Sequence, residues 1–231
     1  MQQLSKPKGL AKIWREVKRP FGVILCRPYI FTPFYKYFIQ PVRLRKKRTV
    51  WNIEIGPGTE KIEGFEAVNV IKDCVTDYVC DLSKEKLPFH DHTIDIIYTS
   101  HFLEHIEWFQ VSHCINEIYR VLKLGGRLEI WVPDGLKILE VLVQAESGKL
   151  LQTPDQWTVF NPGDCPYLWV NGRTFYGANP RYPSWHKGMF TYHYLELLLG
   201  ATGFRNIQKL ENHECRGYDH GWVNLGITAI K

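Results

Sequence analysis

The sequence VWNIEIGPGT, residues 50–59, contains the clearest pattern from which a fold can be predicted. Its first six residues form a short apolar run that is typical of a strand in a parallel sheet. The turn that follows contains Gly56 and Gly58, which let the backbone approach a ligand, and Glu54 places an acid near the end of the strand. Glycine-rich turns follow strands in many folds, so the meaning of this stretch depends on the rest of the chain.

Outward from this stretch, short apolar runs alternate with segments of helical periodicity. The predicted strands span residues 50–55, 67–71, 78–80, 94–99, 127–132, 204–210 and 224–230. The predicted helices span residues 110–122, 136–145 and 192–201. This order predicts an α/β fold with a doubly wound, mostly parallel, seven-stranded sheet, and a ligand site outside the carboxyl ends of its strands.

The composition is that of a globular protein in a reducing compartment. Hydrophobic residues make up 45% of the 231 residues, and no uninterrupted apolar run reaches the roughly 18 residues of a membrane span. The six cysteines include no CxxC pair, which favours reduced thiols. Residues 21–42 are interrupted by charges and prolines and lack a small-residue cleavage site, so we expect no secretory signal and a cytoplasmic location.

The charge is divided unevenly along the chain. Residues 1–48 hold thirteen Lys and Arg against one acid, whereas residues 49–231 carry a net charge of −7. We therefore predict a helical basic arm at 1–48, in which aromatic rings alternate with cations, followed by an acidic domain at 49–231. Three interpretations of the arm stay open: packing on the domain, contact with the inner face of a membrane or a lipid-linked partner, and, less favoured, nucleic-acid binding.

Residues 147–187 form a long stretch without clear periodicity. The segment is dense in Pro, Gly and Asn and contains eight aromatic residues, among them Trp157 and Phe160. A loop of this length in a compact domain is usually functional, so we predict an insertion that acts as a lid. Aromatic rings beside planar polar groups suit a saccharide or another ring-bearing acceptor, and they suit the core of a plain lid equally well.

Several motifs in a fixed order carry a resemblance to a known family. They are NIEIGPG at 52–58, CDL at 80–82, LPF at 87–89, IDIIYTSHFLEH at 94–105, EIYRVLKLGGRL at 117–128 and VPD at 132–134. Residues 50–204 thereby resemble the class I S-adenosylmethionine-dependent methyltransferases, which have a Rossmann-like fold. The chain looks most similar to a bacterial subgroup with a shortened glycine-loop connection, often linked with saccharide biosynthesis.

The resemblance implies S-adenosylmethionine as cofactor and a small or lipid-linked acceptor, with a saccharide as one candidate. It implies that the turn around Gly56 holds the methionine part, that residues 81–82 lie beside the adenine, and that Ser100 and His101 face the sulfonium and the acceptor. The implied cofactor-binding residues are Glu54, Gly56, Gly58, Asn69, Asp81, Leu82 and Ser100. A sugar hydroxyl would need a general base, for which His101 and His186 are the candidates.

Two departures from the family pattern bear on the cofactor. Only about eight residues separate Gly58 from the second predicted strand, whereas a parallel connection needs about a dozen, so the usual crossover helix must be missing or reduced to a turn. The second strand also lacks the acid that commonly holds the ribose, and Asn69 or Asp73 would have to replace it. These departures keep open an alternative, a non-catalytic binding or scaffold module in glycan biosynthesis.

A rival interpretation uses some of the same residues. His101, Glu104 and His105 fit the pattern H-x-x-E-H, which on a helix presents two imidazoles to zinc beside a catalytic glutamate. The pattern makes a zinc hydrolase a minor alternative. Such a site needs a third protein ligand that the sequence does not place, so we expect no metal at these residues.

Overall fold

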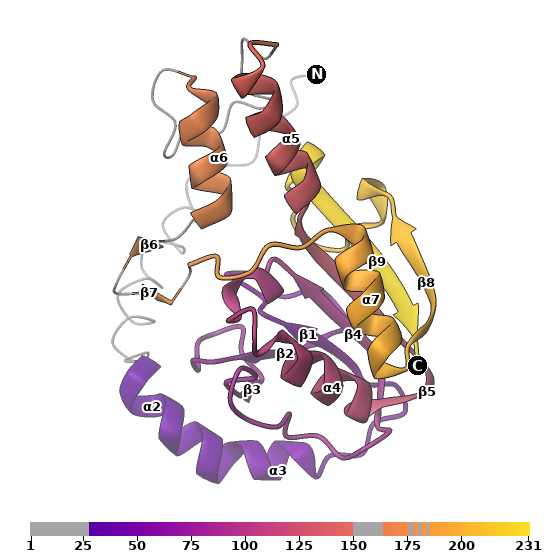
Figure 1. Ribbon diagram of the computed structural model, residues 1–231. Helices are drawn as coiled ribbons and strands as arrows, with labels where there is room; N and C mark the ends of the chain where they lie inside the picture. The colour runs from indigo at the N-terminus through magenta and orange to yellow at the C-terminus, as the bar shows by residue number, and fades with distance from the viewer. Residues whose placement is uncertain (1–27, 150–163, 176–177, 180–181, 184) are drawn as a thin grey trace, which may run out of the picture.

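The computed structural model describes residues 28–149, 164–175, 178–179, 182–183 and 185–231. Its centre is a seven-stranded sheet in the order β3-β2-β1-β4-β5-β9-β8 (Figure 1). Strands β3, β2, β1, β4 and β5 are parallel, and β9 is antiparallel to β5 and β8. The bounds are β1 Asn52–Ile55, β2 Glu66–Asn69, β3 Tyr78–Val79, β4 Ile94–Ser100, β5 Leu122–Pro133, β8 Arg205–Leu210 and β9 Asn224–Ile230. The predicted doubly wound, mostly parallel sheet is confirmed.

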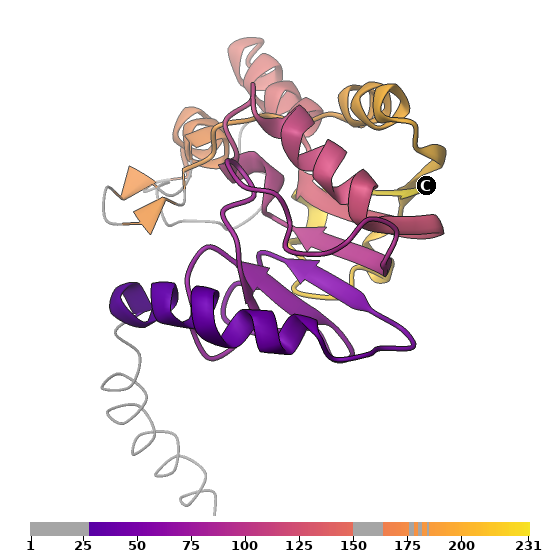
Figure 2. The same cartoon turned by 90° about the horizontal axis from the view of Figure 1, so that it is seen from below.

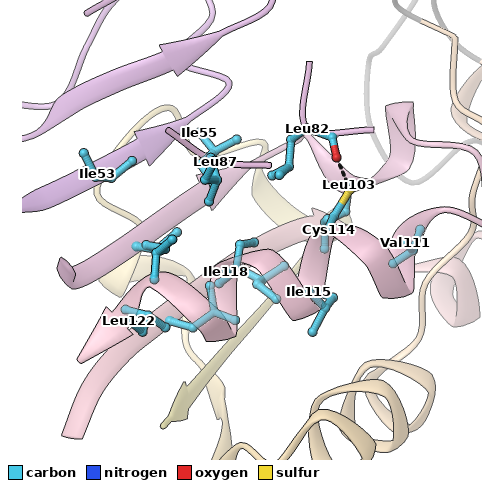
Figure 3. Close-up of a cluster of buried hydrophobic side chains, with 14 of the residues drawn as sticks. Ile53, Ile55, Leu82, Leu87, Leu103, Val111, Cys114, Ile115, Ile118 and Leu122 are labelled. Carbon is cyan, nitrogen blue, oxygen red and sulfur yellow. Dashed lines mark hydrogen bonds between the residues drawn. The ribbon is translucent and has the colours of Figure 1, made fainter. Parts of the chain in front are cut away.

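Two helices, α4 (Val111–Val121) and α7 (Tyr192–Thr202), lie side by side over one face of the sheet (Figure 1). Helix α4 is amphipathic, and its side chains Cys114, Ile115 and Ile118 are buried in the main core (Figure 3). Strand residues such as Ile53 belong to the same core. Burial of each large aliphatic side chain contributes about 1.5–3 kcal/mol, so this face supplies most of the apolar stabilisation.

The opposite face of the sheet receives no helix from the connections between its first three strands. Residues 56–65 and residues 70–77 form turns, which confirms that the first crossover helix is missing. Phe65, Tyr98 and Trp131 form a small buried cluster of their own, with Cys215 packed against it. Loops therefore cover the face on which this cluster lies.

A helical rod formed by residues 28–44 runs beside the β3 edge of the sheet (Figures 1 and 2). The Gln40 side chain pairs with the backbone of Val79, accepting from its N–H at 2.7 Å and donating to its carbonyl at 3.4 Å. The Tyr35 hydroxyl donates to the Asp77 carbonyl at 2.8 Å. These bonds satisfy backbone groups at the edge of the sheet. The rod consists of α2 (Pro28–Phe34), the π-helical turn η1 (Tyr35–Ile39) and α3 (Gln40–Leu44).

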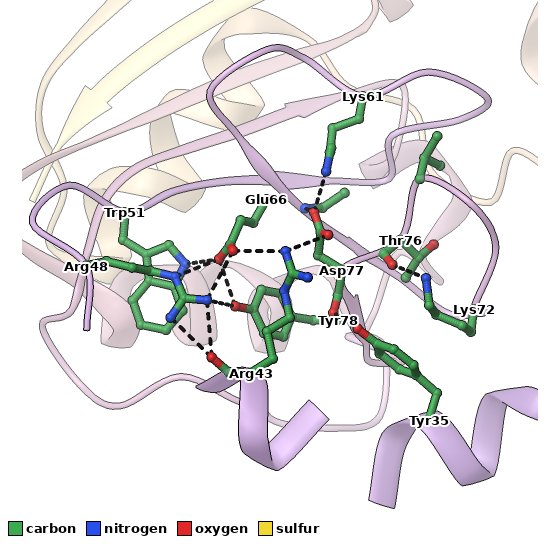
Figure 4. A network of polar contacts seen from close by, with 12 residues as sticks. Tyr35, Arg43, Arg48, Trp51, Lys61, Glu66, Lys72, Thr76, Asp77 and Tyr78 are labelled. Atoms are coloured by element: carbon green, nitrogen blue, oxygen red, sulfur yellow. Dashed lines mark hydrogen bonds and ion pairs between the residues drawn. The ribbon is translucent and has the colours of Figure 1, made fainter. Parts of the chain in front are cut away.

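Glu66, the first residue of β2, binds two arginines at the C-terminal end of the arm (Figure 4). Its carboxylate accepts hydrogen bonds from Arg43 at 3.0 Å and from Arg48 at 2.9 Å. It also accepts from the Trp51 indole and the Tyr78 hydroxyl, both at 2.7 Å. Burial alone would raise the pKa of Glu66, but the bonds from Arg48 and Tyr78 hold it below its ordinary value. Charge-assisted hydrogen bonds thus tie the end of the arm to the domain.

A pair of helices, α5 (Gly135–Glu146) and α6 (Pro166–Phe175), follows β5 (Figure 1). Helix α6 lies in the predicted insertion 147–187, where the sequence shows little helical periodicity. It contains Asn171 and Gly172, which are weak helix formers, and burial of Trp169 against α5 residues such as Ile138 stabilises it. The pair β6 (Ala178–Asn179) and β7 (Tyr182–Pro183) completes the described part of the insertion. Trp157 and Phe160 lie outside the described residues.

Helices α4, α5 and α7 begin and end within one residue of their predicted bounds. Strand β5 differs, because it starts at Leu122 rather than at residue 127. Within the described parts of the chain, no helix is both long and apolar enough to cross a membrane.

Gln40→Ala should destabilise the protein by about 1–3 kcal/mol, because the buried N–H of Val79 would lose its acceptor. The control is Gln144→Ala on the exposed side of α5, which should change the free energy of unfolding by less than about 0.5 kcal/mol. Urea unfolding of the three proteins measures the difference. Equal stability of the two variants would show that the arm does not cap the edge of the sheet.

Candidate active site

A cavity of about 960 Å³ opens at the carboxyl ends of β1 and β4. These strands are neighbours at the point where the strand order reverses, which is where doubly wound sheets bind their ligands. The volume lies within the usual range of small-molecule sites. Its lining includes Glu54, Gly56, Gly58, Ser100, His101 and, from the loop before β9, Arg216, Tyr218 and His220.

The glycine turn after β1 supplies backbone to the cavity. Gly56 and Gly58 have φ values of 76° and 61°, in the left-handed region that favours glycine. A Cβ atom at Gly56 would lie 3.1 Å from the Cβ of Phe102 and 3.2 Å from its ring. Any side chain at Gly56 would therefore push against Phe102, so this turn keeps its shape only with glycine.

Glu54 brings a buried carboxylate to the same turn. Its Oε2 atom accepts a hydrogen bond from the Ile62 N–H at 2.8 Å, which closes the loop between β1 and β2. Burial raises the pKa of Glu54, while the Ile62 bond and the nearby Lys61 lower it by less. Because the carboxylate lines the cavity, it can accept hydrogen bonds from an ammonium group of a ligand.

His101 follows β4 directly, and its backbone has a φ of 50° that turns the chain away from the sheet. Its Nε2 donates to the Asn224 side-chain oxygen at 3.0 Å, and its Nδ1 lies 3.0 Å from Oε1 of Glu104. Asn224 donates to Asp219 at 2.7 Å, which orients the amide. Burial lowers the pKa of His101, but Glu104 and Asn224 raise it above its ordinary value. The ring of His101 is therefore held by protein oxygens on both sides.

His220 is a site residue that sequence reasoning did not select. Its ring packs against His101, with centroids 3.7 Å apart and the ring planes tilted by 35°, and lines the cavity. Desolvation and the neighbouring His101 lower the pKa of His220 to about 4, so the imidazole is neutral at neutral pH. The two histidines are 119 positions apart in the sequence, and only the antiparallel pairing of β9 with β5 brings them together.

The structure brings some of the predicted site residues together in the cavity and places others outside its lining. Glu54, Gly56, Gly58, Ser100 and His101 all line the cavity. The lining does not include Asn69, Asp81 or Leu82, although they lie at the carboxyl ends of β2 and β3. Their roles toward a cofactor stay predictions.

Local contacts occupy those three side chains. Asn69 accepts from the Val70 N–H at 2.8 Å. Asp81 accepts from the N–H and hydroxyl of Ser83 at 3.2 and 2.5 Å. Burial raises the pKa of Asp81, but the bonds to Ser83 and Lys84 hold it below its ordinary value. Leu82 is buried in the main core, where its backbone carbonyl accepts from the Cys114 thiol (Figure 3).

His186, the second candidate base, does not line this cavity. Its Nδ1 bonds to the Arg173 carbonyl at 2.9 Å, and its ring packs edge-on against His105 with centroids 5.0 Å apart. Burial lowers the pKa of His186, and Glu104 opposes this shift only in part. Both predicted bases thus lie near Glu104, but only His101 lines the cavity, and the role of each stays a prediction.

Comparison with known proteins gives a family match over part of the chain. Residues 40–130 match the family model described as a methyltransferase domain. The comparison with curated proteins found no match. Among solved structures, a protein of Methanosarcina mazei described as an S-adenosylmethionine-dependent methyltransferase is 17% identical, with a TM-score of 0.49 over 84% of this chain and 97% of that chain. One from Thermotoga maritima is 18% identical, with a TM-score of 0.45 over 85% and 90%.

The family match supports an enzyme that transfers a methyl group, with S-adenosylmethionine as its cofactor. The residues present fit this cofactor. The turn at Gly56 admits no side chain, and Glu54 offers a carboxylate for the amino group of the methionine part. Ser100 lies at the end of β4, across the same cavity.

Replacing His220 by Asn should flatten the dependence of stability on pH between about 4 and 6.5. In the folded protein the pKa of His220 is about 4, below the ordinary value of 6.5. In that interval the unfolded chain binds a proton that the folded protein does not, so wild-type stability falls as the pH falls. The groups that act on His220 are His101, Glu104, Arg173 and Asp219.

Urea unfolding at a series of pH values measures this slope. The control is His193→Asn, which removes an exposed histidine on α7 that pairs with Glu196. The environment assigned to His220 is wrong if its variant and the wild type lose stability in parallel below pH 6.5.

Proposed function

We propose that the protein methylates a lipid-linked acceptor, with a saccharide hydroxyl as one candidate, at the cavity between β1 and β4, using S-adenosylmethionine. The observation that carries the methyl-transfer part is the cavity itself, with a glycine turn and Glu54 on one side and His101 and His220 on the other. The observation that supports a lipid-linked acceptor is an exposed apolar stripe on the N-terminal rod.

Glu54, Gly56, Gly58 and Ser100 would hold the cofactor, which supplies an electrophilic methyl group when bound. The acceptor oxygen would form a bond to that methyl carbon as the bond between the carbon and the cofactor sulfur breaks, so that S-adenosylhomocysteine leaves and the hydroxyl gives up its proton. His220 takes the released proton, since its neutral imidazole lines the cavity. His101 fixes the place of the His220 ring by packing against it. A general base of this kind typically contributes about 10² to 10⁴ in rate.

The N-terminal rod presents two different faces. Tyr35 and Gln40 bind the domain, whereas the opposite side exposes Phe34, Tyr37, Phe38 and Val42 to the extent of 51%, 70%, 68% and 61%. These four positions follow the i, i+3, i+4, i+8 spacing of one helix face. A helix with such a face lies in the interface of a membrane, with its apolar side among the lipids.

Exposed cations continue this surface. Arg45, Lys46 and Lys47 follow α3 directly and are all exposed. Basic residues at this position are attracted to anionic lipid headgroups by about 1 kcal/mol each. The combination of an apolar stripe and adjacent cations favours a membrane surface over a nucleic acid.

Cofactor binding is tested by adding S-adenosylhomocysteine and measuring thermal unfolding. Ligand at about 100 times its Kd should stabilise the wild-type protein by about 2.7 kcal/mol. Gly56→Val should remove this shift, because the added side chain meets Phe102 in the cradle. The control is Gly148→Val, at a glycine that also has positive φ but has open space around it. Absence of a wild-type shift at millimolar ligand would favour the non-catalytic scaffold.

The membrane surface is tested with vesicles that contain phosphatidylglycerol. Replacing Tyr37 and Phe38 together by Ser should weaken vesicle binding at least about tenfold, because two rings would no longer enter the interface. Val143→Ser, which removes an exposed apolar side chain from α5, is the control and should bind like the wild type.

High salt and neutral phosphatidylcholine vesicles should both reduce binding of the wild-type protein, because screening or loss of the anionic headgroups removes the attraction of the cations. If the double variant sediments with the vesicles as completely as the wild type does, the stripe has no role in membrane binding. Binding of single-stranded nucleic acid that competes with the vesicles would favour the nucleic-acid interpretation instead.

A further inference from the structure

Glu104, His105 and His186 form a cluster beside the cavity residues but outside the cavity lining. One ligand atom from each of the three side chains lies within 4.8 Å of the others. Glu104 and His105 belong to the short turn η2 (Leu103–His105), and His186 lies in the segment that leads into α7. We propose that these three side chains bind one divalent metal ion of the zinc class, independently of the function proposed above.

This ligand set differs from the one that the pattern H-x-x-E-H predicts. In that pattern His101 and His105 would hold zinc and Glu104 would be the base. In the structure His101 faces Asn224 and the cavity, and His186 takes its place beside His105. The third ligand that the sequence does not place is thus supplied from 81 residues further along the chain.

The Glu104 carboxylate is the strongest reason to expect a cation. Its residue is only 1% exposed, and among the described residues its Oε2 atom has no hydrogen-bond partner. Its close charged neighbour is Nδ1 of His101, 3.0 Å from Oε1. Burying a carboxylate is costly unless it is paired or coordinates a metal. An ion between Glu104, His105 and His186 would provide that pairing.

The two imidazoles are already oriented as metal ligands usually are. Nδ1 of His105 lies 3.1 Å from the Trp185 carbonyl, and Nδ1 of His186 lies 2.9 Å from the Arg173 carbonyl. A carbonyl only accepts, so Nδ1 donates in both rings, and in the neutral form of each ring the lone pair that a metal needs is then on Nε2. Outer hydrogen bonds of this kind fix the tautomer and the ring orientation in metal sites.

The donor set identifies the class of ion. Two imidazole nitrogens and one carboxylate oxygen suit zinc and similar transition metals, whereas magnesium and calcium prefer oxygen donors alone. Three protein ligands leave one position open in a tetrahedral site. The ion would join η2 to the segment before α7, two segments that are also linked by the N–H groups of Lys187 and Gly188 donating to the Glu104 carbonyl at 2.6 and 3.2 Å.

The test uses the full chain, freed of metal with a chelator and titrated with zinc chloride and cobalt(II) chloride. We expect one ion per chain, a higher melting temperature with zinc, and a visible cobalt absorption band that zinc removes. His105→Ala, His186→Ala and Glu104→Gln should each weaken zinc binding at least about tenfold. Even the loss of a residue that only hydrogen-bonds to a metal ligand typically lowers metal affinity by about that factor. His193→Ala removes an exposed histidine beside Glu196 and should not change it.

The cobalt band of the wild-type protein needs no variant, so the proposal can be judged even if a substitution prevents folding. Failure of the metal-free wild type to take up an ion overturns the proposal. Equal zinc binding by the wild type, His105→Ala and His186→Ala also overturns it. Neither result bears on cofactor binding, which the response to S-adenosylhomocysteine decides separately.

Discussion

The connections between the first strands are short, and their shortness determines how one face of the sheet is covered. Ten residues, 56–65, join β1 to β2, too few for a crossover helix. The aromatic cluster of Phe65, Tyr98 and Trp131 is consequently covered by loops. One of these loops is fixed by Arg216, which binds Glu129 at 2.6 and 2.9 Å. The cavity lies between that loop and the glycine turn, so the missing helix helps to make room for the site.

Glu104 connects the two polar centres of the molecule. On one side it contacts His101, whose ring packs against His220 in the cavity. On the other side it lies with His105 and His186. The histidines, with His101 first, lower the pKa of Glu104 against the effect of burial. Occupancy of one side by a cation would therefore be felt electrostatically at the other, since both sides share a single carboxylate.

Periodicity and short-range motifs explain how much the sequence could predict. Strands β1 and β4 and helix α4 follow from local apolar patterns, and Glu54, Gly56, Gly58, Ser100 and His101 meet because they follow neighbouring strands. Strand β5 begins earlier than predicted because Leu122 pairs with Ile94, ahead of a register shift between the two strands. The glycines at 125–126 interrupt the apolar pattern there, so the sequence does not indicate the early start. Helix α6 depends on packing with α5, and His220 and His186 reach their places through tertiary contacts. No local pattern encodes such contacts.

The sequence presents packing on the domain and contact with a membrane as alternative interpretations of the basic arm, but the structure is compatible with both. Packing on the domain and contact with a membrane are alternatives only if the arm has one functional face. Lys36 and Arg43 pair with Glu85 and Glu66 of the domain, so part of the positive charge is already neutralised. The exposed apolar stripe points away from these contacts. Because one face of the rod is bound to the domain, the exposed face would be held in a fixed position toward the acyl chain of a lipid. The cavity opens on the same domain.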